Sequence, residues 1–464
     1  MNLKTKQNRK PLVSILLAFC LYFTCAEPSF ANTQGKIPVI MYHNILNSGE
    51  ISEEQKGDVY TVTTENFEKH MKYLYDNKFR SITADELLDF LYNGKALPEK
   101  SIVIQFDDGY YSNIIRAYPI LKKYGFKATI FSNTIKSVNP QMPFSPEGGV
   151  FISKDIMKNT SDVFTYASHT HDLHPKHSDY SWLVVESKEE VVKDIKRSLE
   201  IVDNKTVFTY PYGQYSDEII EAVKEAGIKL AFTTNMGYVT KSSDPYKLNR
   251  FGVYAGTPDG EFQQYVNGRS VYPVKAGPGY IRITPGELEE LRTPSPWAAE
   301  SIKKASALKI APDYLINQYS RYVTRAEFCA FAAKLFEAFS GGEITESKKF
   351  GDTTDVNVEK MAGLGIITGM TDTVFKPNEY LTREQGAVIM ARLAAAAGAP
   401  FPEKGAAFYD NHHISSWAAK SVGQVNGAGI INGIGDNLFA PKYLYTREQC
   451  IVIMVRLFEY FYNT

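Results

Sequence analysis

An internal repeat in the last third of the chain constrains its fold more than any other feature of the sequence. One pattern of residues occurs three times in order, at 322–339, 380–397 and 443–461. In each copy a threonine precedes an arginine and a largely apolar run with helical spacing, which is typical of an N-cap and the helix that follows it. The predicted N-caps are Thr324, Thr382 and Thr446. Each copy predicts a helix, a Gly-rich turn and a second helix, so the region predicts an all-α bundle of three repeats.

The region from about residue 37 to residue 253 has a different pattern, in which short apolar runs alternate with helical segments. Seven runs, from "IPVIMYH" at its start to "LNRFGV" at its end, have the length and composition of buried strands. Helical spacing occurs between them at 65–77, 84–92, 112–124, 188–202 and 216–226. Alternating strands and helices predict a parallel sheet, and this many units favour a barrel over an open sheet. Catalytic chemistry is then expected at the carboxyl ends of the strands.

Residues 1–31 have the pattern of a secretory signal peptide. A basic segment is followed by an apolar stretch, Leu12 to Cys25, and by the small-residue pattern Ser29-Phe30-Ala31. We expect cleavage after Ala31 and no stable membrane span in the mature chain, because the apolar stretch is too short to favour one. An uncleaved anchor is the alternative. The aromatic residues before Cys25 do not fit a lipoprotein signal.

The charge and cysteine content of the mature chain narrow the possible functions and the sources of stability. Without residues 1–31 it has 47 basic and 51 acidic residues, a net charge of −4, so no basic excess indicates nucleic-acid binding. Its cysteines are Cys329 and Cys450, which is too few for a disulfide framework. Stability must therefore come from hydrophobic cores, and the length suffices for two or three domains.

Two polar clusters follow predicted strands. The stretch "SHTHDLH" at 168–174, with His177 beyond it, holds half of the chain's eight histidines. By itself it is compatible with a metal site or with a polar loop. In "QFDDG" at 105–109, two adjacent carboxylates at a strand end must point in different directions, so one could ligate a metal while the other acts as a base. An ordinary Asp-Asp-Gly turn is the alternative.

Taken together with "FTYPYG" at 208–213, these clusters resemble the polysaccharide deacetylases, carbohydrate esterase family 4, also called NodB-like. The resemblance spans about residues 37–255, within a predicted domain at 32–255, and implies a distorted (β/α) barrel. It implies that Asp108, His169 and His174 ligate a divalent metal, with His171 as the rival ligand of His174. Zinc is the first choice for such ligands, and cobalt or nickel would also be accepted. Asp107 would be the general base, and the backbone N–H of Tyr212 would stabilise the oxyanion.

The sequence departs from the common family pattern in two places. The late Leu-x-His motif that supplies the acid is missing, and "VIMYHNI" instead places His43 after the first strand. This arrangement resembles the poly-N-acetylglucosamine deacetylases of biofilms and implies that His43 is the acid, although a buried core histidine is the alternative. Thr209 stands where many members have an arginine that braces the base. We expect Asp172 to orient a ligand imidazole.

The three repeats, about 293–342, 350–398 and 408–461, resemble S-layer homology (SLH) domains, which bind secondary cell-wall polymers, often pyruvylated. The resemblance implies that three arginines face anionic groups and that two tryptophans lie beside sugar rings. These residues are Arg325, Arg383, Arg447, Trp297 and Trp417. The alternative is that the arginines pair with acidic neighbours such as Glu327. Residues 256–292 are unassigned, as a linker or an added strand pair.

These features predict a secreted, metal-dependent N-deacetylase of N-acetylglucosamine units, in poly-N-acetylglucosamine or peptidoglycan, attached to a Gram-positive-type cell wall. An O-acetyl esterase acting on xylan or another glycan is one alternative, because the same chemistry cleaves esters. A non-catalytic protein that binds the wall is the other.

Overall fold

The computed structural model describes residues 35–177, 179–269, 280–281 and 283–463. The predicted signal peptide therefore lies outside the described residues. The described residues from 35 onward form one compact unit. Among the described residues, no helix combines the length and apolar character that a membrane span requires.

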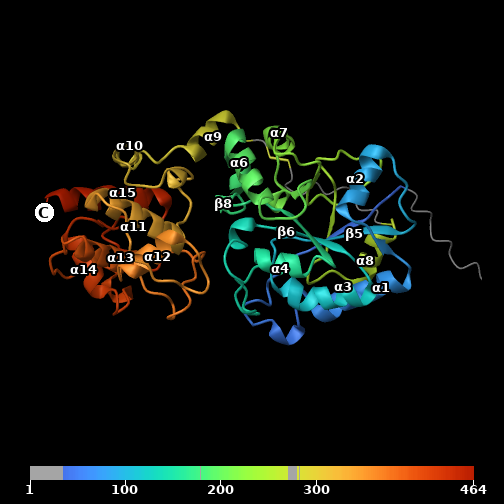
Figure 1. The fold of residues 1–464 in the computed structure, drawn as a ribbon, viewed down its shortest axis with the longest axis horizontal. Coiled ribbons are helices and arrows are strands. Elements are labelled where there is room, and N and C mark those ends of the chain that lie inside the picture. Colours follow the sequence, from blue (N-terminus) through green and yellow to red (C-terminus); the bar gives the residue numbers. More distant parts are fainter. Residues whose placement is uncertain (1–34, 178, 270–279, 282, 464) are drawn as a thin grey trace, which may run out of the picture. The chain divides into compact units, whose positions relative to one another are not determined.

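A parallel sheet forms the core of the first part of the chain (Figure 1). Its order is β11-β10-β7-β6-β5-β1-β12, with β4 also paired to β5. The strands are β1 (Val39–Tyr42), β4 (Arg80–Ser81), β5 (Ser101–Phe106), β6 (Ala128–Ser132), β7 (Phe164–Ser168), β10 (Val207–Thr209), β11 (Leu230–Phe232) and β12 (Phe251–Gly252). Seven of these strands coincide with the seven predicted apolar runs, because strands covered on both faces are almost continuously apolar.

The two ends of the sheet approach each other through a short segment. Leu248 pairs with Phe232 of β11, and three residues later Phe251 of β12 pairs with Ile40 of β1. The sheet is thus curled into the distorted barrel that the sequence predicts. Arg250 lies in this closing segment, and its side chain is fully buried.

Amphipathic helices cover the sheet. In α1 the buried residues Phe67, His70, Met71 and Leu74 recur at helical spacing, so one face of the helix packs on the core. The helices of this part are α1 (Thr64–Asp76), α2 (Ala84–Asn93), α3 (Tyr118–Tyr124), α4 (Lys154–Asn159), α5 (Trp182–Val185), α6 (Lys188–Leu199) and α7 (Asp217–Glu225). A π-helix, Asn113–Ala117, precedes α3. Two small sheets pair β2 (Asn44–Leu46) with β3 (Thr61–Thr63), and β8 (Lys176–His177) with β9 (Tyr180–Ser181).

The described part of 256–292 contains two helices, and Tyr280 forms an isolated parallel β-bridge with Tyr215. The helices are α8 (Asp259–Val266) and α9 (Pro285–Arg292). Phe262 and Tyr265 of α8 are buried in the barrel core, so α8 extends that core.

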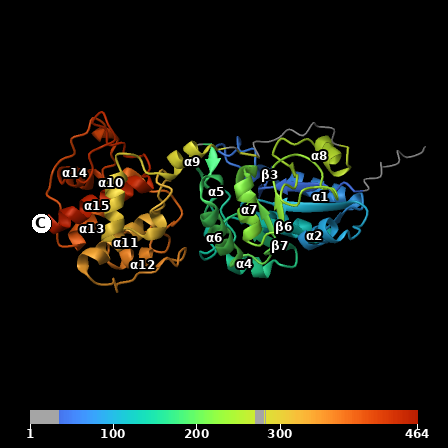
Figure 2. The same cartoon turned by 90° about the horizontal axis from the view of Figure 1, so that it is seen from above.

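Six helices form the bundle of the three repeats, visible in both views (Figures 1 and 2). They are α10 (Ala299–Leu308), α11 (Arg325–Ser340), α12 (Val356–Gly363), α13 (Arg383–Ala396), α14 (Ala419–Gly427) and α15 (Arg447–Asn463). The three predicted threonine N-caps are confirmed, because each side chain accepts a hydrogen bond from the backbone three residues later. Equivalent backbone bonds join the repeats in a ring, from the N–H of Arg325 to Glu379, of Arg383 to Tyr443 and of Arg447 to Arg321.

Candidate metal centre and active site

Three potential metal ligands come together at the carboxyl ends of β5 and β7. The side-chain donor atoms of Asp108, His169 and His174 all lie within 4.8 Å of one another. The Nε2 atoms of His169 and His174 are 3.7 and 3.0 Å from Oδ1 of Asp108. Thr170 has a left-handed φ of 77°, which supplies the turn needed to bring two histidines five residues apart onto one point. This donor set fits a divalent cation such as zinc.

Two of the three ligands, His169 and Asp108, are held in the electrostatic state that suits a metal. Burial lowers the pKa of His169 to about 4, so its imidazole is neutral at physiological pH. Burial raises the pKa of Asp108, but His174 and the nearby His43 outweigh that effect and hold it far below its ordinary value. An ionised carboxylate and neutral imidazoles are the forms that ligate cations.

Thr209 orients His169. The Nδ1 atom of His169 lies 2.9 Å from the carbonyl oxygen of Thr209 and 2.6 Å from its hydroxyl. A hydrogen bond from Nδ1–H to the carbonyl fixes the tautomer that presents Nε2 to a cation. Thr209, which stands in place of the usual arginine, therefore contacts the ligand His169.

The rival ligand His171 points elsewhere. Its Nδ1 bonds the hydroxyl of Thr134 at 3.0 Å, and it is not among the residues whose ligand atoms converge. Of the two alternatives, His174 is the histidine that the geometry brings to Asp108.

Asp107 follows the last residue of β5 and is not among the converging ligands. Its two carboxylate oxygens accept hydrogen bonds from the two Nη atoms of Arg250, both at 2.8 Å. The Nε of Arg250 donates to the carbonyl of Thr233 at 2.8 Å and Nη1 also donates to Oε1 of Gln105 at 3.3 Å, so four hydrogen bonds fix the guanidinium. Burial raises the pKa of Asp107, but Arg250 and His169 outweigh it and keep the carboxyl below its ordinary pKa.

Arg250 is thus the brace for Asp107 that the sequence analysis did not find. It lies 143 residues along the chain from Asp107. The signal that could have found it is an arginine inside the apolar run "LNRFGV", because a charged residue in a buried strand needs a buried partner.

His43 and Tyr212 lie beside the same carboxylates. His43 follows β1 and lies close enough to Asp107 and Asp108 to contribute to the lowered pKa of both carboxyls. Its Nδ1 is buried without a hydrogen-bond partner among the described residues, and its ring lies 4.7 Å from that of Tyr60. Tyr212 has a left-handed φ of 56°, and its ring centroid is 4.9 Å from that of His174.

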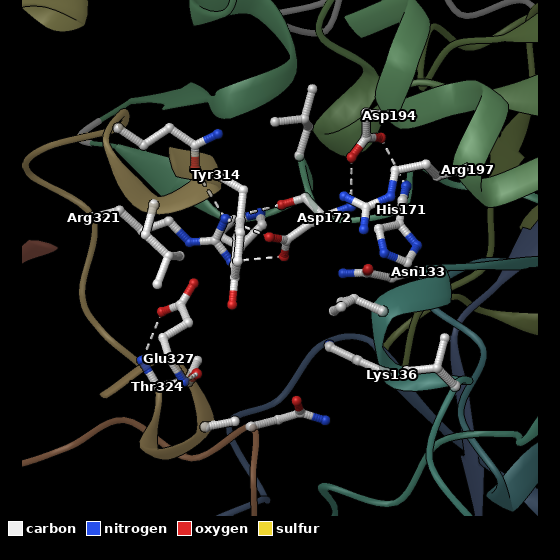
Figure 3. A pocket seen from close by; sticks show the side chains of 18 of the residues that line it. Asn133, Lys136, His171, Asp172, Asp194, Arg197, Tyr314, Arg321, Thr324 and Glu327 are labelled. Atoms are coloured by element: carbon white, nitrogen blue, oxygen red, sulfur yellow. Dashed lines mark hydrogen bonds and ion pairs between the residues drawn. The ribbon is translucent and has the colours of Figure 1, made fainter. Parts of the chain in front are cut away.

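Two carboxylates hold the loop at 169–174, which carries His169, His171 and His174 (Figure 3). Asp172 lies in the loop itself, and Asp194 lies in α6. The backbone N–H groups of His171 and Asp172 both donate to Asp194 of α6 at 2.7 Å. Burial raises the pKa of Asp194 to about 7, although these two bonds lower it. The prediction that Asp172 orients a ligand imidazole is wrong, because its carboxylate accepts both hydrogen bonds from Arg321, at 2.7 and 3.0 Å.

The residues predicted to bind wall polymers divide into two groups. Trp297 and Arg383 line one cavity of about 360 Å³ in the bundle, and Trp417 and Arg325 line another of about 190 Å³. Arg447 lines neither. Its Nη2 is 2.6 Å from Oε1 of Glu327, which is the pairing considered as the alternative for these arginines.

Two families match the chain. The family model described as polysaccharide deacetylase matches residues 94–231, and the S-layer homology domain model matches residues 357–387 and 407–450. YxkH of Bacillus subtilis (strain 168), whose name assigns it to the polysaccharide deacetylases, is 30% identical over 233 residues, which cover 50% of this chain and 76% of YxkH.

The poly-beta-1,6-N-acetyl-D-glucosamine N-deacetylase of Staphylococcus epidermidis is 33% identical over 205 residues, which cover 42% of this chain and 68% of that enzyme. Among solved structures, the Streptococcus pyogenes deacetylase PplD in complex with acetate matches with a TM-score of 0.44 and 25% identity, over 50% of this chain and 98% of PplD.

Proposed function

Because the chain belongs to the polysaccharide deacetylase family and carries S-layer homology repeats, we propose that it is a secreted, metal-dependent N-deacetylase. It would hydrolyse the acetamide of N-acetylglucosamine units in a polysaccharide and be held at the cell wall by its repeats. The observation that carries this proposal is the convergence of Asp108, His169 and His174 beside a second carboxylate that has its own brace.

The three converging residues would hold the metal. Zinc suits two imidazoles and one carboxylate, and cobalt or nickel would also be accepted. A bound divalent cation would activate water for attack and polarise the acetyl carbonyl. Thr209 would keep the imidazole of His169 in the ligating orientation.

Asp107 and His43 would move the protons. Asp107 is ionised and fixed by Arg250, so it can accept a proton from the attacking water. His43 would donate a proton to the amine nitrogen as the C–N bond breaks. The backbone N–H of Tyr212, in the Pro211–Gly213 turn, would stabilise the oxyanion. The products are acetate and a free amino sugar.

The substrate class is supported by the relatives. The similar staphylococcal enzyme is named for poly-beta-1,6-N-acetyl-D-glucosamine, and a polymer of this kind is the first candidate for this chain. Peptidoglycan is the second, because it contains the same acetamido sugar. Exposed aromatic rings beside the ligand cluster, Tyr60, Tyr212 and Tyr254, suit the stacking of sugar rings.

The proposal is tested by acetate release from the mature chain. We expect release from β-1,6-linked N-acetylglucosamine oligomers, loss of release on chelation and recovery when zinc, cobalt or nickel is restored. Release from acetylated xylan alone would favour an O-acetyl esterase. Asp108→Ala and His174→Ala should lose metal content and acetate release together, with the exposed His412→Ala as the matched control. Full activity in either ligand variant would show the ligand assignment to be wrong.

A further inference from the structure

The loop at 169–174 carries two of the three proposed metal ligands, and the barrel holds both of its ends. The N–H of His169 donates to a carbonyl of β6 at 3.0 Å. The carbonyls of Leu173 and Pro175, on either side of His174, accept hydrogen bonds from the backbone of α5 at 3.0 and 2.9 Å. The support for the middle of the loop, at Asp172, comes partly from outside the barrel.

Arg321 of the first repeat binds Asp172 at three atoms. Its Nη2 donates to Oδ1 of Asp172 at 2.7 Å, and its Nη1 donates to Oδ2 at 3.0 Å and to the backbone carbonyl at 3.3 Å. Asp172 stands two positions before His174 in the chain. A bidentate pair of this kind fixes geometry as well as charge, so the guanidinium holds the side chain and the backbone of Asp172 together.

Asp172 is held from the opposite side by the barrel. Figure 3 shows it between Arg321, which binds its carboxylate, and Asp194 of α6, which accepts its backbone N–H at 2.7 Å. The backbone of the loop is thus anchored to a barrel helix, and the outward carboxylate is anchored to the repeats. The position of this segment depends on both partners.

The burial of Arg321 is specific to the first repeat. The ring of backbone bonds that joins the repeats places Arg321, Glu379 and Tyr443 at one equivalent position. Glu379 is exposed and Tyr443 is 65% exposed, whereas Arg321 is only 7% exposed. A charged residue is seldom buried without a partner, and the partner of Arg321 is in the loop at 169–174. The contact with the barrel, and not the repeat pattern, therefore accounts for this burial.

A cavity separates the loop from the bundle beside this ion pair. Its volume is about 710 Å³, and it is lined by Leu173 and Pro175 on the side of the barrel and by Tyr314 and Tyr380 on the side of the repeats. The interface is hollow here, so packed neighbours are not in place to take over the contact if Arg321 is removed.

We propose that Arg321 is a positioning residue for the metal site, so that the repeat bundle is a structural part of the catalytic centre. The ion pair with Asp172 sets the position of the loop segment that presents His174. Ligating side chains must be held within about 0.5 Å of the productive geometry, so a small shift of this segment weakens metal binding. The inference rests on the proposed metal-dependent function and adds to its site a residue from outside the barrel.

Competition between the mature chain and a chelator for zinc tests this without any substrate. Arg321→Met and Asp172→Asn remove the same contact from its two sides. Each should weaken zinc binding about tenfold, at the low end of the usual effect of residues that orient metal ligands, because α5 and Asp194 still hold the loop. The double variant should bind zinc no more weakly than either single variant, because one contact can be lost only once. Two effects that multiply to about 100-fold would overturn the proposal.

Glu379→Met is the matched control, because it changes the equivalent exposed position in the second repeat. It should leave zinc affinity unchanged, and a loss equal to that of Arg321→Met would overturn the proposal. Arg321→Lys should recover part of the affinity, because an ammonium still contacts one carboxylate oxygen. The absorption spectrum of the cobalt-loaded chain reports ligand geometry, and it should change in Arg321→Met but not in Glu379→Met.

Thermal melting shows which variants are folded. Should Arg321→Met not fold, the double variant carries the test, because it leaves no buried charge unpaired. Full zinc affinity in the folded double variant would overturn the proposal.

The proposed function is tested separately with soluble oligomers. Zinc binding that depends on Arg321, without acetate release from the wild-type chain, would refute deacetylation and leave the positioning role. Acetate release with kcat and zinc affinity unchanged in Arg321→Met would refute the positioning role and leave deacetylation. A wild-type chain that binds neither zinc, cobalt nor nickel would refute both.

Discussion

At the scale of single residues, Arg250 is the side chain on which the proposed general base depends. Replacing it with methionine would leave Asp107 buried without its partner, and breaking a buried ion pair of this kind costs about 3–5 kcal/mol of stability. A misplaced base should lower kcat by about 100-fold or more, within the usual range for general base catalysis. KM and bound metal should change little, because the ligand cluster is separate.

Kinetics of acetate release and metal analysis of the folded variant check this prediction. Arg250→Lys should recover part of kcat, because an ammonium can contact one carboxylate oxygen but cannot reproduce the fork. An Arg250→Met variant that is folded and has full kcat would show that Asp107 needs no brace or is not the base.

Thr209 offers a second test at this scale. Thr209→Val removes the hydroxyl that lies 2.6 Å from Nδ1 of His169 but keeps the backbone carbonyl. Loss of a partner of a ligating histidine typically costs 10–100-fold in metal affinity, and we expect about tenfold here because one of the two contacts remains. Competition with a chelator of known affinity measures the change.

Thr134→Val is the matched control for Thr209→Val. It removes the equivalent hydroxyl contact from His171, so it should leave metal affinity unchanged. If Thr134→Val also weakens metal binding, His171 is the ligand in place of His174.

The sequence predicts some parts of the site and cannot predict others. Asp107 and Asp108 are adjacent and follow a strongly apolar run, and the histidines are dense within one loop, so local patterns reveal them. Arg250, Thr209 and Arg321 act on groups far away in the sequence, and their contacts exist only because the fold brings the segments together. Asp172 shows the same limit, because its partner lies 149 residues away.

At the scale of secondary structure elements, the contact between α1 and α8 gives a pH-dependent prediction. His70 of α1 is 3% exposed, its ring stacks on Phe262 of α8 at 4.0 Å, and its Nδ1 is 3.1 Å from the hydroxyl of Tyr42. Burial lowers the pKa of His70 to about 4, from an ordinary value of 6.5, and Asp259 only partly opposes this. In the folded state the imidazole therefore stays neutral, while in the unfolded state it takes up a proton below about pH 6.5.

His70 thus contributes stability that is present above pH 6.5 and is lost as the pH falls toward 4. At pH 4.5 the loss should be about 2.5 kcal/mol, from 1.36 kcal/mol for each pKa unit. His70→Gln does not titrate, so the difference in unfolding free energy between pH 7.5 and pH 4.5 should shrink by about that amount. The exposed His412→Gln should leave the difference unchanged.

Urea unfolding followed by the fluorescence of Trp182 measures this difference. Trp182 is fully buried in the barrel region, and the chain has three tryptophans, so Trp297 and Trp417 are replaced by phenylalanine in every protein compared. An unchanged pH dependence in His70→Gln would mean that His70 titrates normally in the folded protein.

Elements with strong periodicity are predictable, whereas α8 and α9 are not. Each helix has only eight residues. Both lie in a stretch rich in glycine and proline, which hides the helical spacing of apolar residues. What fixes α8 is tertiary packing, because Phe262 and Tyr265 fill a space in the barrel core that the sequence alone does not reveal.

At the scale of the whole molecule, the recurring pattern makes the three repeats predictable, and the first copy also carries a sequence signal that it differs from the other two. The second and third copies open with Phe-x-Asp, at 350–352 and 408–410, and the first copy has no such opening. In each of these two copies the aspartate binds the backbone of a later phenylalanine, whose carbonyl accepts a hydrogen bond from Arg325 or Arg383. Asp352 accepts from the N–H of Phe375, and Asp410 from that of Phe439, both at 2.8 Å. In the first copy Asn317 stands at the position of these later phenylalanines, Phe375 and Phe439, and its side chain binds Arg447 directly. The missing opening is therefore a sequence signal that Arg447 makes different contacts from Arg325 and Arg383.

The proposed catalytic and wall-binding functions should respond differently to metal removal, because they would use different chemistry. The proposed catalytic site depends on a cation held by Asp108 and two histidines. The proposed wall-binding residues Arg325 and Arg383, which line the two cavities of the bundle, are permanently charged and need no metal. Chelation of the mature chain should abolish acetate release from soluble oligomers and leave the fraction that sediments with cell walls unchanged, and added zinc should restore release. An Arg325→Met/Arg383→Met variant should keep acetate release from soluble oligomers and lose sedimentation with cell walls. Release of the wild-type protein from walls on chelation would show that attachment itself depends on a metal, which the bundle's geometry gives no reason to expect.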